Sequence, residues 1–253
     1  MNNFYNNLWR HEWKRLVAWG PSIFTKYRII IKLIKRYGLS GELIDIGCGA
    51  GELLFRLKNT LPGKFSVLYG MDISEEAITT AVAKRAADVF LRCDLADADI
   101  ASIGRTFDVV VLAEVLEHIE DYQKAIAQAA KLLKPNGHLI AVVPHAQKYW
   151  TQHDDFSGHF RRFEKGQIES ELEKNGCLTL NSFAWGALIY NFYYLFLGRA
   201  QPQKIMDAQH LCLKKIISGF LQYAFMLDDL LIWTAKGRKL FIVAKKEGVK
   251  LAY

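Results

Sequence analysis

The stretch "AEVLEHIED", residues 113–121, concentrates side chains that could do chemistry. Glu114, Glu117 and His118 follow directly on an apolar run, so a helix that begins here would carry all three on one face, because residues three and four apart are neighbours on a helix. Two carboxylates and an imidazole on one face could hold a divalent metal ion. Acidic residues are equally favoured at an ordinary helix start by the backbone dipole. This stretch alone leaves both interpretations open.

The elements that must position these residues alternate between short apolar runs and helical windows. The spacing predicts strands at 42–47, 66–72, 89–94, 107–113, 137–144, 177–183 and 239–245, and helices at 52–60, 75–86, 121–134 and 164–175. Alternation of this kind predicts an α/β protein with a Rossmann-like, seven-stranded, mostly parallel sheet and helices on both faces.

Composition indicates a folded globular protein. The chain has 253 residues and 51% hydrophobic content, which is enough for a full core. Its cysteines show no CxxC spacing, which argues against a disulfide framework and against a cysteine-based zinc site. The N-terminus lacks an apolar leader, so we expect a cytoplasmic protein, with peripheral attachment to the cytoplasmic membrane as a further option.

Charge divides the chain into basic ends and an acidic middle. Residues 1–37 hold eight Lys/Arg against one acid, and residues 199–253 hold ten against four. Residues 1–37 therefore predict a basic helical cap, with helices at 8–19 and 22–37, ahead of a single domain at 38–253. Basic segments that contain Trp, Tyr and Phe suit an anionic membrane surface or a nucleic acid backbone.

An apolar helical insert is predicted within that domain at 184–235. Its first run, "AWGALIYNFYYLFLG", is short for a spanning helix, and Asp228 and Asp229 interrupt the second. The insert is expected to bind a membrane interface, or to form a lid or a dimer surface buried in protein.

A glycine-rich loop follows the first strand. The segment "LIDIGCGAGEL", residues 43–53, places Gly47, Gly49 and Gly51 between that strand and a helix, where the lack of Cβ atoms lets the backbone turn tightly and approach a ligand. An acid, Asp45, stands two residues before the first glycine, and the GxGxG spacing differs from the dinucleotide fingerprint. The segment resembles motif I of the class I S-adenosylmethionine-dependent methyltransferases.

Further motifs of that family match in order over about residues 41–145. The resemblance implies that Asp72 accepts hydrogen bonds from the ribose hydroxyls, that Asp94 contacts the adenine amino group, and that Asp45 holds the methionine ammonium. The cofactor-binding residues implied are Asp45, Gly47, Gly49, Gly51, Asp72, Ile73, Asp94, Leu95, Ala113 and Glu114. S-adenosylmethionine is the cofactor implied.

The opening stretch has a counterpart in the same family. "ExxEH" with a distant histidine resembles the metal-binding arrangement of the ubiquinone-pathway O-methyltransferases and of the small-RNA 3′-terminal 2′-O-methyltransferases. The resemblance implies a divalent metal held by Glu114, Glu117, His118 and His159. The same motif is widespread in metal-free members, so His118 or His159 as a metal-free base, and a purely structural role, remain open.

Other candidates are weaker. His145, at the end of the fifth strand, is a third catalytic candidate, whereas His153 is expected in a loop. Arg161 and Arg162 either meet an anionic group of the substrate or pair with acids.

These observations predict an S-adenosylmethionine-dependent methyltransferase that acts on the oxygen of a hydrophobic or lipid-linked small molecule at a membrane surface, such as a quinone precursor or an envelope glycolipid. An RNA 2′-O-methyltransferase is the enzymatic alternative, with nucleic acid as its partner. A regulatory module that binds the cofactor without turnover is the alternative from another class. The sequence predicts no oligomeric state.

Overall fold

The computed structural model describes residues 21–96, 103–197, 219–231 and 236–248. The helix predicted at 8–19 lies outside these ranges, and so do parts of the insert. The helix predicted at 22–37 is confirmed as α3 (Pro21–Arg36). The division of the chain at residue 37 stays a prediction.

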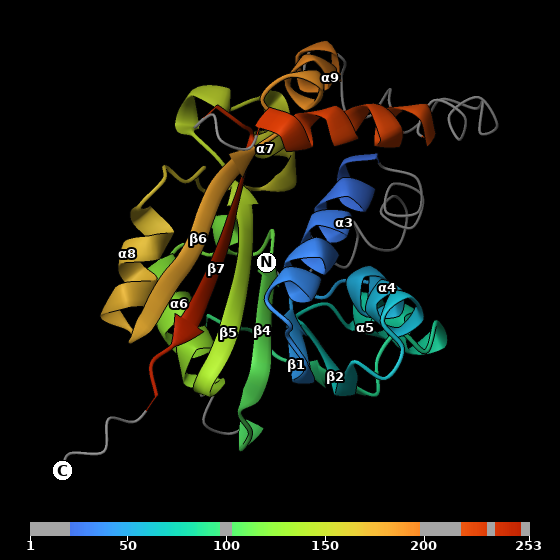
Figure 1. Cartoon of the computed structure of the whole chain (residues 1–253), viewed down its shortest axis with the longest axis vertical. Coiled ribbons are helices and arrows are strands. Elements are labelled where there is room, and N and C mark those ends of the chain that lie inside the picture. Colours follow the sequence, from blue (N-terminus) through green and yellow to red (C-terminus); the bar gives the residue numbers. More distant parts are fainter. Residues whose placement is uncertain (1–20, 97–102, 198–218, 232–235, 249–253) are drawn as a thin grey trace.

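A single seven-stranded sheet forms the centre of the molecule (Figure 1), in the order β3-β2-β1-β4-β5-β7-β6. The strands are β1 (Gly41–Ile46), β2 (Phe65–Asp72), β3 (Val89–Arg92), β4 (Phe107–Ala113), β5 (Leu133–Pro144), β6 (Cys177–Trp185) and β7 (Lys239–Lys246). All seven predicted strands are confirmed, with shifts at their ends. The mostly parallel Rossmann-like sheet is confirmed as well.

Strand β7 is the one strand of this sheet that runs against its neighbours. It pairs antiparallel with β5, where Pro144 lies opposite Lys239, and antiparallel with β6, where Trp185 lies opposite Lys239. The first residue of β7 therefore lies at the edge of the sheet where the parallel strands end. This topology brings the C-terminal part of the chain to the carboxyl ends of β4 and β5.

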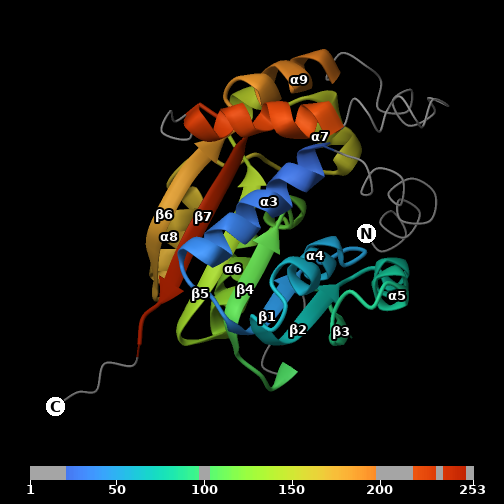
Figure 2. The ribbon, with the colours of Figure 1, turned by 45° about the vertical axis from the view of Figure 1, so that its right-hand side comes forward.

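Helices cover both faces of the sheet (Figure 2). One face carries α3, α4 (Glu52–Thr60) and α5 (Glu75–Ala83), and the other carries α6 (Tyr122–Lys131) and α8 (Gln167–Lys174). The predicted helices at 52–60, 75–86, 121–134 and 164–175 are thus confirmed, and the last three are shorter than predicted.

Two hydrophobic cores result, because successive strand residues point to opposite faces. On β1, Leu43 packs with Ile30 and Leu53 beneath α3 and α4, whereas Ile44 packs with Ile126 beneath α6. All five of these side chains are fully buried. Helix α3 therefore belongs to the core of the sheet domain.

The described part of the insert forms two helical segments that lie across the carboxyl-end edge of the sheet (Figures 1 and 2). These are α9 (Ile189–Leu197) and residues 219–231, which end in the 3₁₀ segment η5 (Phe225–Leu231). Asp228 is 1% exposed and accepts hydrogen bonds from the first backbone N–H groups of α9, including that of Tyr190 at 2.7 Å. Asp229 accepts two hydrogen bonds from the guanidinium of Arg28 on α3. Of the two acids that interrupt the apolar run, Asp228 therefore joins the two helical segments of the insert, and Asp229 fixes the insert to α3.

The chain does not turn directly from strand to α-helix at residues 113–118, so the shared helical face considered for Glu114, Glu117 and His118 does not form. Glu114 has a backbone φ of +64°, in the left-handed region, and the chain then forms a short 3₁₀ turn, η3 (Leu116–His118), so that α6 begins only at Tyr122. Glu114 consequently does not share a helical face with Glu117 and His118. A left-handed conformation is uncommon for a residue other than glycine, so sequence spacing does not reveal it.

Candidate functional site

The glycine loop joins β1 to α4 at the carboxyl-end edge of the sheet. The backbone N–H of Gly47 donates to Met71 O at 2.7 Å, which ties the loop to the end of β2. Gly47 and Gly51 have φ values of +70° and +73°, and a Cβ on Gly51 would lie 2.5 Å from that of Ala86. Glycine is therefore required here by both backbone conformation and space.

Asp72, the last residue of β2, fastens the same loop. Its Oδ2 accepts from Gly49 N at 2.8 Å, and its Oδ1 accepts from Ser74 N at 2.9 Å. Each carboxylate oxygen has a second lone-pair site, so these bonds leave capacity for ribose hydroxyls. Asp94 lies beyond β3 and accepts from Ala96 N at 2.9 Å. The carboxylates of Asp72 and Asp94 are partly exposed, which suits contact with a nucleoside.

Asp45 lies beneath the loop and is 3% exposed. The pKa of Asp45 is raised to about 7: burial raises it most, Lys26 lowers it, and Asp72 raises it. A buried carboxylate of this kind favours a cation beside it. The methionine ammonium of S-adenosylmethionine would supply that cation, so the donors and acceptors of this site fit the cofactor.

Glu114 lies at the end of β4 and is held by two buried lysines. Lys26 of α3 donates to Oε2 at 2.8 Å, and Lys239, the first residue of β7, pairs with Oε1. Lys26 and Lys239 are 6% and 5% exposed. The carboxylate of Glu114 is therefore directed to lysines, and it is not brought together with the other three residues of the predicted metal cage.

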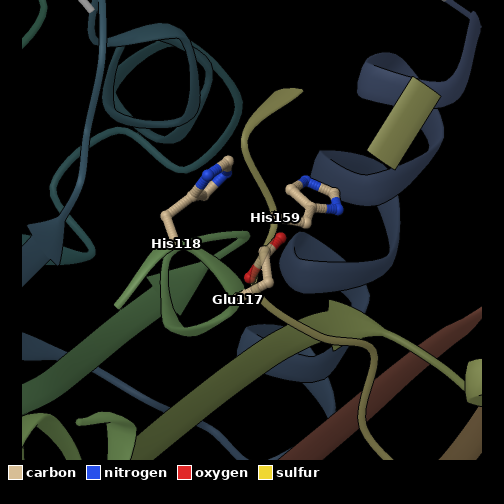
Figure 3. A group of neighbouring side chains, drawn as sticks. All are labelled: Glu117, His118 and His159. Atoms are coloured by element: carbon tan, nitrogen blue, oxygen red, sulfur yellow. The ribbon is translucent and has the colours of Figure 1, made fainter. Parts of the chain in front are cut away.

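Glu117, His118 and His159 do come together (Figure 3). Their ligand atoms all lie within 4.8 Å of one another, and the rings of His118 and His159 meet edge to face at 4.7 Å. Glu117 is 0% exposed, and its two carboxylate oxygens have no hydrogen-bond partner among the described residues. Burial raises the pKa of Glu117, against the charge of His159. Burial and His159 lower the pKa of His118 to about 3.

His159 is oriented by a carboxylate that the sequence did not single out. Its Nδ1 lies 2.8 Å from Asp154 Oδ1, and Arg162 donates to Asp154 Oδ2 at 2.9 Å. Burial alone would raise the pKa of Asp154, but the hydrogen bonds from His159 and Arg162 outweigh it and lower the pKa. An ionised carboxylate only accepts, so the proton of a neutral His159 lies on Nδ1 and its Nε2 can accept a proton.

Asp154 belongs to a helix that the prediction missed. Thr151 and Asp154 form a capping box at the start of α7 (Gln152–Ser157), with Asp154 Oδ2 accepting from Thr151 N at 2.8 Å. The T-x-x-D spacing is a sequence signal for a helix start and could have located it. His153, predicted in a loop, lies in the first turn of this helix.

The remaining candidates are placed as follows. His145 is 5% exposed, and its Nδ1 bonds to Gly237 O at 2.6 Å, an arrangement typical of a structural histidine. Arg161 donates to Ile119 O and lies over Tyr122. Ile73 is half-buried beside the loop, and Leu95 and Ala113 are buried.

A small, partly open pocket lies between the end of β4, α7, α9 and the start of β7. Glu114 and His159 line it together with a set of cationic and aromatic residues: Arg162, Arg238, Lys239, Tyr190 and Tyr194. Sequence reasoning missed Arg238 and Lys239, because it treated the C-terminal basic residues as part of a surface.

Comparisons with known proteins agree with this geometry. Residues 44–139 match the family described as "Methyltransferase domain". The chain is 34% identical over 99 residues to the ubiquinone biosynthesis O-methyltransferase of Parvibaculum lavamentivorans, which covers 38% of this chain and 37% of that protein. It is 30% identical over 109 residues to the malonyl-[acyl-carrier protein] O-methyltransferase of Hahella chejuensis, covering 42% and 38%. The chain thus spans less than half of these relatives' length.

Solved structures match over nearly the whole chain. The magnesium protoporphyrin IX methyltransferase of Synechocystis, with bound S-adenosylhomocysteine, aligns with a TM-score of 0.61 at 18% identity over 97% of this chain and 98% of that one. An N-methyltransferase of Bradyrhizobium japonicum, in complex with S-adenosyl-L-homocysteine, aligns with a TM-score of 0.60 at 17% identity over 96% of each chain. At these identities the likeness shows the fold.

The glycine loop, the strand-end acids and the sheet order together define a class of protein. Residues 44–139 belong to the methyltransferase domain family, and the chain has the fold of the class I S-adenosylmethionine-dependent methyltransferases. S-adenosylmethionine is the cofactor of this class.

Proposed function

We propose that this protein transfers a methyl group from S-adenosylmethionine to a hydroxyl oxygen of a small molecule, with His159 as the base. The observation that carries the proposal is the pair of Asp154 and His159 at the wall of the pocket, with Nδ1 held at 2.8 Å. The names of the two curated relatives, both O-methyltransferases, support an oxygen acceptor.

The cofactor supplies an activated methyl group when bound, so the protein has to align the acceptor and take up its proton. His159 Nε2 accepts the hydroxyl proton as the new O–CH₃ bond forms and the S–CH₃ bond breaks. Asp154 fixes the ring and stabilises the imidazolium that results, in the manner of a carboxylate that orients a catalytic histidine. Arg162 holds Asp154 in place from its other oxygen.

The test is transfer of a labelled methyl group to a panel of small hydroxyl compounds that includes a polyprenylated phenol. His159→Ala should lower turnover by about 10²–10⁴-fold while S-adenosylhomocysteine still binds. His145→Asn is a control, because that histidine does not line the pocket, and it should keep turnover within a few-fold if the variant folds. Full turnover in His159→Ala would contradict the assignment of the base.

A divalent metal at Glu117, His118 and His159 is the second candidate, and the orphaned, fully buried carboxylate of Glu117 favours it. Two imidazoles and one carboxylate suit Zn²⁺, Mn²⁺ or Fe²⁺. Asp154 would then be the carboxylate behind a histidine ligand. A bound metal would lower the pKa of a substrate hydroxyl. Loss of turnover on chelation, with recovery on added metal, would favour this candidate, whereas full turnover after exhaustive chelation would exclude it.

The acceptor is proposed to be apolar or lipid-linked and to be reached at an anionic membrane surface. The described insert exposes a set of large apolar side chains on its two helical segments and directly before α9: Leu188, Phe192, Leu195, Phe220, Tyr223, Leu227 and Leu230. Residues 199–253 carry ten Lys/Arg against four acids; Arg238 and Lys239 are buried, and the remaining basic residues would complement anionic lipid. Among the described residues, no helix has the length and apolar character needed to cross a bilayer.

Flotation with vesicles tests this location. Phe220 and Leu230 are 72% and 74% exposed, so replacing both with Ser should reduce binding to anionic vesicles. Phe55→Ser is the matched control, because Phe55 is 43% exposed on α4, away from the insert. If the protein ignores vesicles and binds small RNA with a steep salt dependence, the RNA alternative replaces the lipid one. If no acceptor supports turnover in a protein that binds the cofactor, the regulatory module replaces the enzyme.

A further inference from the structure

The acceptor pocket holds more buried positive charge than its carboxylates balance. Lys26 and Lys239 share the single carboxylate of Glu114, and burial together with the charge of Lys26 lowers the pKa of Lys239 well below its usual value. Arg162 is balanced by Asp154. Burying an uncompensated charge in a protein is costly, so such an excess predicts an anionic ligand.

Within the described part of the chain, Arg238 is the clearest case of a buried positive charge in this pocket that no carboxylate balances. It is 4% exposed, lines the pocket, and has no carboxylate partner among the residues that the structure describes. Its Nε donates to Asn191 Oδ1 at 2.7 Å, and its Nη1 donates to Tyr149 O at 3.2 Å. Both partners are neutral. Within the described ranges, Nη2 donates to no protein acceptor, which leaves a charged donor at the pocket.

The planar guanidinium is also held in place by aromatic rings. Its central carbon lies 4.7 Å from the ring centre of Tyr149 and 5.3 Å from that of Tyr194, within the range of cation–π contacts. Tyr194 also lines the pocket. Burial lowers the pKa of Arg238, and the nearby charge of Arg162 adds to this. The two neighbouring cations therefore repel each other across a pocket that an anion would stabilise.

We propose that Arg238 is a specificity-determining residue that binds a phosphate or carboxylate group on the acceptor, with Lys239 at the same end of the pocket. The inference rests on the proposed function, and it narrows the acceptor to a molecule with both an apolar or aromatic part and an anionic group. Guanidinium binds these groups through paired hydrogen bonds. The Tyr190 and Tyr194 rings provide the surface for the uncharged part.

The test compares phenyl phosphate, the probe, with phenol, an uncharged compound that has the same ring. Each is titrated by calorimetry into the full chain saturated with S-adenosylhomocysteine. Phenyl phosphate should bind, and phenol should bind at least tenfold more weakly. Arg238→Met should weaken phenyl phosphate at least tenfold and leave phenol unchanged. Arg161→Met is the matched control, since that guanidinium also lies over aromatic rings but does not line the pocket, and it should bind the probe as the wild type does.

Two further arms keep the outcomes distinct. Arg238→Lys keeps the charge and loses the paired donors, so it should weaken phenyl phosphate several-fold even if Arg238→Met does not fold. Vesicles of phosphatidic acid show whether the anionic group belongs to a lipid headgroup or to a diffusible acceptor. If the Arg238 variants lose binding to these vesicles, the anionic group is that of a lipid headgroup. If they keep it, the anionic group is that of a diffusible acceptor.

Equal affinity for phenyl phosphate in the wild type and in a folded Arg238 variant would overturn the inference, and so would equal affinity for phenol and phenyl phosphate. A chain that binds S-adenosylhomocysteine but no anion would overturn this inference alone. A chain that does not bind S-adenosylhomocysteine would overturn the proposed function.

Discussion

Cofactor binding should release a proton from Asp45, and this coupling can be measured without knowledge of the acceptor. Asp45 is buried, and its pKa of about 7 is set first by burial and then by the opposing effects of Lys26 and Asp72. The ammonium of the bound methionine moiety adds a cation near this carboxylate. An opposite charge within about 4–6 Å lowers a carboxyl pKa by about 1–3 units, so the cofactor should drive Asp45 to its ionised form.

The size of the effect follows from the two titrations. At about pH 6.5, a group with a pKa of about 7 is protonated in roughly three quarters of the molecules, and with the pKa lowered by about 2 units almost none keep the proton. The α-amino group of the cofactor, with a pKa of about 7.7–8.0, is already charged at that pH and takes up almost nothing. Binding should therefore release about 0.7 proton per cofactor at about pH 6.5.

The assay is calorimetric titration with S-adenosylhomocysteine in buffers that differ in ionisation enthalpy, where the dependence of the observed enthalpy on the buffer gives the number of protons released. Asp45→Asn should remove most of the release. Asp88→Asn should retain it, because hydrogen bonds from Leu68 N and Lys58 lower the pKa of Asp88 and keep it ionised. A wild-type protein that releases no proton, or an Asp45→Asn variant that releases as many, would refute the reasoning.

Three other outcomes test the surrounding structure. Burial lowers the pKa of His118 to about 3, so its contribution to the free energy of unfolding is fully present above pH 6.5 and is lost as the pH falls toward 3. Between about pH 7 and pH 5, the free energy of unfolding measured in urea should therefore fall by about 2 kcal/mol less in His118→Gln than in the wild type. Equal losses in the two proteins would contradict this. Asp154→Asn should shift the His159 tautomer away from Nδ1–H in ¹⁵N NMR spectra, and an unchanged tautomer would exclude the orienting role. Gly51→Ala should destabilise the protein by about 1–3 kcal/mol and weaken S-adenosylhomocysteine binding, since its Cβ would lie 2.5 Å from Ala86, and normal affinity would show that the loop tolerates a side chain.

The fold could be predicted from the sequence because its signals are local. Short apolar runs such as 107–113 locate buried parallel strands, and the glycine loop after β1 is both a chemical motif and a boundary between elements. Asp72 and Asp94 could be located for the same reason, because Asp72 ends β2, Asp94 stands two residues after the end of β3, and each strand is specified by its own sequence.

The acceptor pocket could be predicted only in part, because it is assembled from distant segments. Lys26 and Lys239 meet Glu114 only after α3 crosses the sheet and β7 inserts antiparallel between β5 and β6, and no local pattern specifies either event. The left-handed backbone of Glu114 also interrupts the helical spacing that would have placed Glu114 and His118 on one face. Asp154 differs, since its capping-box spacing was readable in the sequence.

The central claim is that the loop after β1 and the acid at the end of β2 bind S-adenosylmethionine. The most direct test compares the affinity for S-adenosylhomocysteine of the wild type with that of Asp72→Ala. The substitution removes the acceptor of the ribose hydroxyls, and it also removes the bond to Gly49 N at 2.8 Å. Affinity should fall by on the order of 2–4 kcal/mol, or roughly 30- to 1000-fold, in a variant whose circular dichroism shows a folded protein. Equal affinity in the two proteins, or no binding by the wild type, would contradict the claim.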